Sequence, residues 1–256
     1  MTSKGDLEPQ VRCLRLCKSF DGTVALSDAT LELVGSQIAA IIGPNGAGKT
    51  TLLNVLTGVV RPDSGRCLVN GSVTAGLALH SITKLGAART FQDVRLIRKA
   101  SALDNVMLGM PGQRGEALLG ALVRVGVADE EAKNRQRSLG LLEFVGLEQS
   151  ARSPAGELSY GEQKLLSLAC CLATDPQVLL LDEPVAGVHP GMVPHILSRL
   201  RSLKAEGRLV VFIEHDIAAV REVADLVVVM DGGRVIASGT PSDVLSRPEI
   251  LEAYVT

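Results

Sequence analysis

The segment Gly43–Thr50 reads Gly-Pro-Asn-Gly-Ala-Gly-Lys-Thr and satisfies the phosphate-binding pattern G-x-x-x-x-G-K-[ST]. Its glycines permit backbone angles that side chains forbid, so successive N–H groups can turn inward around an anion. Lys49 can reach the β- and γ-phosphates of a nucleotide as a compact positive charge, and the Thr50 hydroxyl can ligate Mg²⁺. The segment therefore predicts a site for nucleotide phosphates, although a glycine-rich turn can also match the pattern by chance.

Two carboxylates, Asp182 and Glu183, follow the continuous apolar run Val178–Leu181. Carboxylates at the end of a buried strand are costly unless they have partners or a function. In doubly wound sheets, ligands bind beyond the carboxyl ends of the strands. Beside a phosphate loop, Asp182 can position Mg²⁺, directly or through water, and Glu183 can orient or deprotonate the attacking water. Taken alone, the pair could equally be a solvated strand end.

A histidine follows a further apolar strand, Arg208–Ile213. His215 is therefore expected at the same sheet edge as Asp182, where it could contact a γ-phosphate. A lone histidine at a strand end is more often structural, so the residue alone leaves both readings open. Asp216 is expected to cap the helix that follows.

The elements around these residues have the order of an α/β protein. A short apolar strand, Gln37–Ile42, precedes the phosphate-binding segment, and Leu52, Leu53, Val55 and Leu56 follow it at helical spacing. From about residue 93 to 173 the pattern becomes helical. The helices predicted there are Ala102–Leu108, Glu116–Val125, a helix capped by Asp129 that runs through Val145, and Leu165–Ala173.

Further strands are predicted at both ends of the chain. Val11–Lys18 and Ala29–Val34 are expected strands, with Phe20 at the turn between them. Phe20 can stack on an adenine ring or simply pack against its neighbours. The other expected strands form two hairpin-like pairs: Arg66–Val69 with Ser72-Val73, and Leu226–Met230 with Arg234–Ser238.

Bulk composition limits the classes of function. The chain has 256 residues, with 26 Lys and Arg against 28 Asp and Glu, so no overall basic excess indicates a nucleic-acid partner. No apolar run approaches the roughly 18 residues that span a bilayer, and the first six residues lack the apolar core of a signal peptide. The five cysteines are expected to be reduced thiols that fill small core positions.

Together, these motifs resemble those of the ATPase subunits of ABC transporters over essentially the whole chain. The matching pieces, in chain order, are GPNGAGKTT at 43–51, Gln92 after Ala-Arg-Thr-Phe, LSYGEQ at 158–163, LLLDEP at 179–184 and His215. A narrower resemblance is to the ATPases of branched-chain amino-acid importers. It rests on ARTFQDVRL at 88–96, LSYGEQKLL at 158–166, EPVAGVHP at 183–190 and the ending ASGTPSDVL…PEILEAYV. Urea, short-amide and lipopolysaccharide-transport ATPases share much of this narrower match.

The resemblance implies a fold and its subdivision. The fold is α/β: a P-loop NTPase core of the ABC ATPase type, with an antiparallel β subdomain and an inserted α-helical subdomain. Residues 1–256 would form a single ABC ATPase domain. In it, residues 1–92 and 174–256 make up the nucleotide-binding core with the antiparallel β subdomain, and residues 93–173 make up the helical subdomain with the signature motif.

The resemblance also implies roles for individual residues. Glu183 matches the catalytic carboxylate and His215 the switch histidine. The expected metal-site residues are Thr50, Gln92 and Asp182, and Gln92 also links the helical subdomain to the core. The residues expected to bind ATP are Phe20, Gly43, Pro44, Asn45, Gly46, Ala47, Gly48, Lys49, Thr50, Thr51, Gln92, Ser159, Tyr160, Gly161 and Glu162. Ser159–Glu162 lie in the signature, which contacts the γ-phosphate held by a partner subunit.

Implied cofactors and partners follow from the same resemblance. ATP and Mg²⁺ are the expected cofactors. The expected partners are a second ATPase subunit, identical or not, bound head to tail; transmembrane permease subunits; and, indirectly, a solute-binding protein. The chain is expected at the cytoplasmic face of the cell (inner) membrane as a peripheral subunit. Segment 93–110 is the expected docking region, through Leu96, Ile97, Leu103, Val106, Met107 and Met110, although these side chains could also pack the core of their own subdomain.

Some positions depart from the family pattern. His189 stands where the family usually has Asn or Asp in the loop that crosses the dimer. The helix that follows, from Met192, lacks the acidic residues common there, and its Pro194 is tolerable only in a first turn. Ser167 and Cys170 replace the Glu and Arg that often occupy the helix after the signature. The alternatives to an amino-acid importer are a related urea or amide importer, a lipopolysaccharide-type export system and a non-transport ABC protein. A P-loop kinase would leave the signature at 158–163 unexplained, and an inactive subunit would be expected to lose Lys49, Glu183 or His215.

Overall fold

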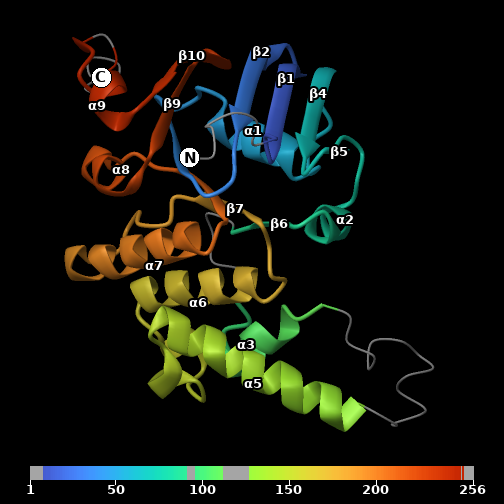
Figure 1. Ribbon diagram of the computed structural model, residues 1–256, viewed down its shortest axis with the longest axis vertical. Helices are drawn as coiled ribbons and strands as arrows, with labels where there is room; N and C mark the ends of the chain where they lie inside the picture. The colour runs from blue at the N-terminus through green and yellow to red at the C-terminus, as the bar shows by residue number, and fades with distance from the viewer. Residues whose placement is uncertain (1–7, 91–95, 112–126, 249, 251–256) are drawn as a thin grey trace, which may run out of the picture. The chain divides into compact units, whose positions relative to one another are not determined.

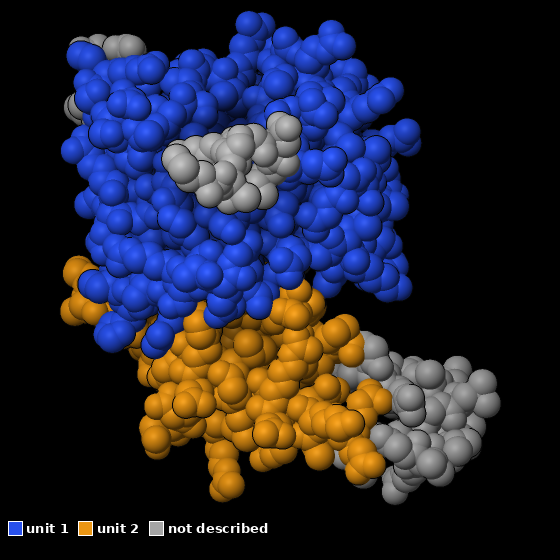
Figure 2. All heavy atoms as spheres, in the orientation of Figure 1, with its two compact units in different colours: residues 1–92, 176–186, 193–256 blue, residues 93–175, 187–192 orange. Residues whose placement is uncertain are grey.

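The structure is a computed structural model that describes residues 8–90, 96–111, 127–248 and 250. The chain divides into two compact units, coloured separately in Figure 2. Unit 1 comprises residues 1–92, 176–186 and 193–256, and unit 2 comprises residues 93–175 and 187–192. Two predictions, the helix Glu116–Val125 and the role of Gln92, concern positions outside the described residues.

Unit 1 is built on a six-stranded sheet with the order β10-β9-β3-β8-β7-β6. Its strands are β3 (Ile38–Ile42), β6 (Ala87–Arg89), β7 (Val178–Asp182), β8 (Leu209–Ile213), β9 (Leu226–Asp231) and β10 (Arg234–Gly239). All neighbouring strands run parallel except β10, which pairs antiparallel with β9 as the predicted hairpin requires. The sheet confirms the predicted α/β class and brings the ends of β3, β7 and β8 to one edge.

The middle strands of this sheet are buried and mostly aliphatic. Every residue of β3, β7 and β8 is buried, which explains why these strands, apart from Asp182 at the end of β7, are continuous apolar runs without alternation. Phe212 is the one aromatic residue among these three strands. Aliphatic packing therefore holds the strands that carry the candidate site residues.

A second, antiparallel sheet of unit 1 has the order β2-β1-β4-β5. Its strands are β1 (Val11–Phe20), β2 (Thr23–Leu33), β4 (Ser64–Val69) and β5 (Ser72–Val73), and β1, β2 and β4 lie side by side in Figure 1. Burial alternates along much of β1 and β2, as expected of strands with one buried face. Cys13 of β1 lies opposite Cys67 of β4, and both side chains are buried, which confirms the predicted core positions of these two cysteines.

The helices of unit 1 are α1 (Lys49–Leu56), α2 (Leu79–Lys84), α7 (Val193–Ala205), α8 (Ile217–Val223) and α9 (Pro241–Val244). Leu52, Leu53, Val55 and Leu56 of α1 belong to one buried cluster that also contains residues of both sheets. Pro194 is the second residue of α7, where its missing N–H costs nothing. Asp216 caps α8 by accepting N–H bonds from Ala218 and Ala219, as predicted.

Unit 2 is helical in its described part. Its helices α3 (Ala102–Leu108), α5 (Val127–Val145) and α6 (Tyr160–Leu172) contact one another, and 3₁₀ turns occur at Glu148–Ser150, Ala155–Glu157 and Pro190–Met192. The prediction that Asp129 caps α5 is wrong, because the helix already includes Val127. Asp129 instead lies in the first turn, where a carboxylate is favourable beside the helix N-terminus. Among the described residues, no helix is long and apolar enough to cross a membrane.

Candidate functional site

The segment between β3 and α1 is held in a tight loop by its glycines. Gly43 and Gly48 both have positive φ, and a Cβ at either would lie within 2.3 Å of a backbone oxygen, from Met230 and Ala25 respectively. Only glycine fits these two positions. Gly48 also precedes the first residue of α1, so the loop delivers the chain directly into a helix N-terminus, which favours anions.

Lys49 occupies the first position of α1 with only 6% of its surface exposed. Its Nζ donates hydrogen bonds to the carbonyl oxygens of Gly43 (2.7 Å) and Pro44 (2.9 Å) in its own loop. Burial lowers the pKa of Lys49, while the charges of Glu183 and Asp182 act in the opposite direction and raise it. The ammonium group is therefore held where two carboxylates influence it.

The loop lines a pocket of about 390 Å³ within unit 1. The pocket lining includes seven predicted phosphate-site residues, Asn45 through Thr51, together with Glu183 and His215. Thr23, Val24, Ala25 and Ile213 complete the lining. Residues predicted from three separate motifs thus meet around one cavity.

Glu183 is held in an uncommon backbone conformation beside His215. Its φ is 50°, in the left-handed region that a residue with a side chain rarely adopts, and its N–H donates to the Ile213 carbonyl at 3.0 Å. Glu183 Oε1 lies 3.4 Å from His215 Nε2, and the two side chains are 19% and 41% exposed. A carboxylate and an imidazole therefore face each other at the rim of the pocket, with access to water.

Glu214 links the segments that carry these two side chains. It is 1% exposed, and its two carboxylate oxygens accept the backbone N–H groups of Val185 (2.8 Å) and His215 (3.1 Å). Burial raises the pKa of Glu214, three backbone N–H groups lower it, and the charge of Glu183 raises it, with a net upward shift from 4.5. This single buried carboxylate ties the loop after β7 to the loop after β8.

The raised pKa of Glu214 gives a testable pH dependence. A carboxyl whose pKa is higher in the folded state stabilises the fold most below 4.5, and that contribution is lost as the pH rises through the folded-state pKa. Glu214→Gln cannot titrate, and at pH 4.5 it should be less stable than the parent protein by about 1 to 3 kcal/mol, because its amide nitrogen cannot accept an N–H bond. Thermal unfolding of both proteins upward from pH 4.5 should therefore show the variant's deficit shrinking. A deficit that stays constant over this range would contradict the assignment.

Asp182, the last residue of β7, is buried and paired. Its Oδ2 accepts a hydrogen bond from Arg89 Nη2 at 2.9 Å, and the two side chains are 4% and 3% exposed. Asp182 does not itself line the pocket but directly precedes Glu183, which does. The metal-positioning role predicted for Asp182 stays a prediction, and no motif predicted its buried partner, Arg89.

Phe20 lies at the end of β1, with 44% of its surface exposed. Its ring is 5.2 Å from Lys18 Nζ, and it is not part of the pocket lining, although Thr23 and Val24 of the following turn are. Exposure at this turn leaves the ring available for stacking. The adenine contact of Phe20 stays a prediction.

The signature residues Ser159–Glu162 belong to unit 2, at the start of α6. Ser159 caps the helix in a reciprocal arrangement: its backbone N–H and Oγ both donate to Glu162 Oε2, at 2.8 and 2.6 Å, and the Glu162 N–H donates back to Ser159 Oγ at 3.4 Å. Tyr160 is 46% exposed, with Lys164 Nζ 5.4 Å from its ring centre. Gly161 is buried against Val188.

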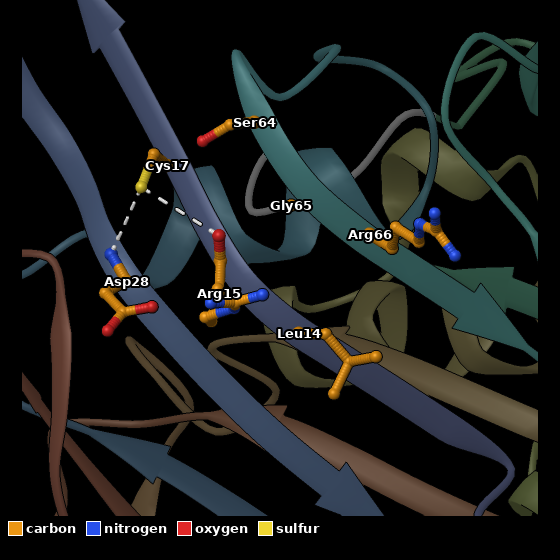
Figure 3. Close-up of a pocket in the computed structure, with 7 residues that line it drawn as sticks. All are labelled: Leu14, Arg15, Cys17, Asp28, Ser64, Gly65 and Arg66. Atoms are coloured by element: carbon orange, nitrogen blue, oxygen red, sulfur yellow. Dashed lines mark hydrogen bonds between the residues drawn. The ribbon is translucent and has the colours of Figure 1, made fainter.

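A larger cavity, about 710 Å³, lies over β1, β2 and β4 of the antiparallel sheet (Figure 3). Figure 3 shows the Cys17 thiol at this site, where it contacts the Arg15 carbonyl (3.9 Å) and the Asp28 N–H (3.4 Å). Arg15 and Asp28 both have positive φ, and the pairing of β1 with β2 is irregular near them. The Cys17 thiol therefore contacts the backbone of both strands where they are bulged. None of the predicted site residues lines this cavity, and larger size alone does not make it the site.

Two residues of the site were not predicted from the sequence. Arg89 and Glu214 have no role predicted from any motif, yet each bridges two segments of the site. A charged residue at the end of a short apolar strand, as in Ala87–Arg89, or directly after one, as at Glu214, is the signal that could have identified them. Their partners, however, could not be read from local sequence.

Comparison with known proteins identifies relatives across nearly the whole chain. A protein-family model described as "ABC transporter" matches residues 26–186. The high-affinity branched-chain amino acid transport ATP-binding protein BraF of Pseudomonas aeruginosa is 34% identical over 242 residues, which cover 94% of this chain and 95% of that protein.

Solved structures agree with this match. The ADP conformation of MJ1267, an ATP-binding cassette of an ABC transporter, superposes with a TM-score of 0.85 and 32% identity, over 96% of this chain and 98% of that one. The dimeric structure of MJ0796, a bacterial ABC transporter cassette, gives a TM-score of 0.76 and 25% identity, over 90% and 98% of the two chains.

Proposed function

This chain belongs to the ABC transporter family, as an ATP-binding subunit that hydrolyses ATP, and on that basis we propose that it powers the import of branched-chain amino acids through a membrane permease. The observation that carries the ATPase assignment at the level of residues is the pocket of unit 1. There, Lys49 and the phosphate loop meet Glu183 and His215. The proposed solute class rests on the printed function of relatives such as BraF.

Within this proposal, the phosphate loop binds the nucleotide phosphates. Backbone N–H groups of Asn45–Thr51 and the N-terminus of α1 surround the anion, and Lys49 transfers its hydrogen bonds from the loop carbonyls to the β- and γ-phosphates. Phe20 stacks on the adenine ring from the exposed turn after β1. Gly43 and Pro44 shape the loop and supply the carbonyls that hold Lys49 before nucleotide binds.

The oxygen donors of the site suit Mg²⁺. Thr50 offers a hydroxyl and Asp182 a carboxylate, and both are hard oxygen ligands of the kind that Mg²⁺ prefers. Within the described residues no three acidic, histidine or cysteine side chains gather to hold a metal by themselves, which fits an ion that takes its remaining ligands from phosphates and water. When bound, Mg²⁺ would neutralise phosphate charge, and Gln92 is proposed as a further residue of its site.

Glu183 and His215 are proposed to carry the hydrolytic step. Glu183 accepts a hydrogen bond from the attacking water and orients it toward the γ-phosphorus. His215, 3.4 Å from Glu183 Oε1, contacts the γ-phosphate and fixes the carboxylate beside it. Glu214 keeps the two supporting loops together through its bonds to Val185 and His215.

We propose that two such subunits act together. One subunit has too few donors to enclose a γ-phosphate, so a second subunit, identical or different, would complete each site head to tail with its signature residues Ser159–Glu162. The solved dimer of MJ0796, a bacterial cassette of similar fold, supports a paired arrangement. The division into a core (1–92 and 174–256) and a helical subdomain (93–173) belongs to the same proposal.

The permease is proposed to dock on the helical subdomain and to hold the chain at the cytoplasmic face of the membrane. Leu103, Val106 and Met110 are buried and pack their own unit, whereas Ile97 is 55% exposed and available to a partner. Of the apolar side chains predicted to dock the permease in segment 93–110, only the exposed ones, such as Ile97, are therefore proposed to contact it. A solute-binding protein would act on the permease and not on this chain.

Membrane retention tests the docking proposal. In cells that express this chain together with its permease, Ile97→Glu should release the chain from the membrane fraction, because a carboxylate cannot enter an apolar contact without a large desolvation cost. Ile236→Glu is the matched control, since Ile236 is also 55% exposed but lies in unit 1. Equal retention of both variants, each with parental ATPase activity, would place the docking surface elsewhere.

The transported solute requires its own experiment. The reconstituted complex should show ATP-dependent uptake of leucine, isoleucine or valine into vesicles. Uptake of urea or a short amide instead, or outward movement of lipid-linked sugar, would replace the proposed solute class with one of the related systems. The ATPase assignment would survive either outcome.

A further inference from the structure

Arg89 is a buried cation at the end of β6. Its side chain is only 3% exposed, in a strand whose other two residues are alanines. Its guanidinium donates hydrogen bonds to Asp182 Oδ2 at 2.9 Å, Asn54 Oδ1 at 2.6 Å and Thr57 Oγ1 at 3.3 Å. The first partner belongs to β7 and the other two to α1 and its C-terminal cap.

The contact with Asp182 is part of a connection between two strand ends. β6 and β7 run parallel, and the Thr90 N–H donates to the Leu180 carbonyl at 3.0 Å. The Asp182 N–H in turn donates to Thr90 Oγ1 at 3.3 Å. Two consecutive residues thus hold Asp182: Arg89 binds its carboxylate and Thr90 binds its backbone N–H. The carboxylate meets the guanidinium through its Oδ2 atom.

On its other side, Arg89 holds the helix that carries Thr50. α1 begins at Lys49 and continues through Asn54, so the anchor on Asn54 is just over one turn from Thr50. A guanidinium presents its donors in a rigid plane, unlike the single rotating ammonium of lysine. One side chain therefore sets the spacing between the helix with Thr50 and the strand with Asp182.

A purely structural role does not account well for this arrangement. A buried ion pair costs both partners their hydration, and an apolar pair of similar size often stabilises a fold as well or better. The buried Arg89–Asp182 pair is explained if Arg89 must hold the Asp182 carboxylate in place while that carboxylate still binds a divalent cation. This rests on the proposed function, which assigns Thr50 and Asp182 to the Mg²⁺ site.

We propose that Arg89 is a positioning residue for the divalent-cation site. It fixes the carboxylate of Asp182 and its spacing from Thr50, and it touches neither nucleotide nor metal. Loss of its geometry should therefore weaken the contribution of Mg²⁺ to nucleotide binding, while the contacts of the phosphate loop itself remain.

The test compares equilibrium binding of a fluorescent ATP analogue in Mg²⁺ and in EDTA. Arg89→Lys keeps the charge but cannot reach Asp182, Asn54 and Thr57 together. Its affinity in EDTA should stay within about twofold of the parent protein, and the gain in affinity on adding Mg²⁺ should fall about tenfold or more, as for other residues that orient a metal ligand. Arg201→Lys is the matched control, because Arg201 forms an exposed ion pair with Glu222 in the same unit and should change neither affinity.

Two outcomes overturn the proposal. An unchanged Mg²⁺ gain in folded Arg89→Lys would show that the spacing is set by other groups. Equal losses in Mg²⁺ and EDTA would show a general structural role. If Arg89→Lys does not fold, Asn54→Ala removes the anchor on α1 and leaves the ion pair intact, and the same selective loss is expected. A parent protein that gains nothing from Mg²⁺ would instead refute the proposed function, and the inference with it.

Discussion

The Glu183→Gln variant should bind ATP with parental affinity and hydrolyse it more slowly by a factor of about 100 or more, the usual scale for loss of a general base. Gln has nearly the same shape, so the left-handed backbone at this position and the N–H bond to Ile213 can persist. The amide cannot take a proton from water. An ATP-bound dimer should therefore accumulate, because hydrolysis no longer resolves it.

Steady-state phosphate release and size-exclusion chromatography in the presence of ATP measure these two effects. Glu222→Gln serves as the control, since it neutralises a carboxylate that is 48% exposed in the same unit and should leave the rate unchanged. Normal hydrolysis by Glu183→Gln would remove the residue from the role of base, and Asp182 or His215 would have to be considered in its place.

The Lys49→Ala variant should lose most of the protein's affinity for ATP. A hydrogen bond to a charged group contributes about 1.5 to 3 kcal/mol, so deletion of the ammonium should weaken binding about ten- to hundredfold. The phosphate loop also loses the donor that Gly43 and Pro44 share, and this adds a cost in the unbound protein.

Titration with a fluorescent ATP analogue gives the affinity, and thermal unfolding shows whether the variant is folded. Lys204→Ala is a suitable control, because Lys204 pairs with Asp225 on the surface and is 37% exposed. A folded Lys49→Ala protein with unchanged affinity would refute the assignment of the phosphate loop.

The parts of the fold that the sequence predicts best are those with continuous apolar runs. The predicted strands Gln37–Ile42 and Arg208–Ile213 differ from β3 and β8 by one residue at one end, because burial on both faces leaves a clear run of aliphatic side chains. Helix ends are harder to predict. Asp129 has the right residue type for a cap, but the local energies of a cap and of a first-turn carboxylate are similar, and the helix begins earlier.

The candidate site shows the same contrast between local and distant information. Motifs supply Lys49, Glu183 and His215, because each has a fixed place next to a predicted strand or helix. They cannot supply the pairs Arg89–Asp182 or Glu214–Val185, whose members are 93 and 29 positions apart in the chain. These contacts depend on which strands are neighbours, and strand order is a property of the whole sheet.

The order β9-β3-β8 also has a consequence for the sequence of events during synthesis. β3 delivers the phosphate loop, yet both of its neighbours, β8 and β9, come from residues 209–231. When the ribosome has made Ile38–Ile42, no partner strand for it exists, and contacts of such long sequence separation form slowly. These five aliphatic residues must therefore stay out of aggregates while some 170 further residues are added, a wait of about 10 to 30 seconds at ordinary elongation rates. The strand that leads into the phosphate loop is thus made early but gains its native neighbours late.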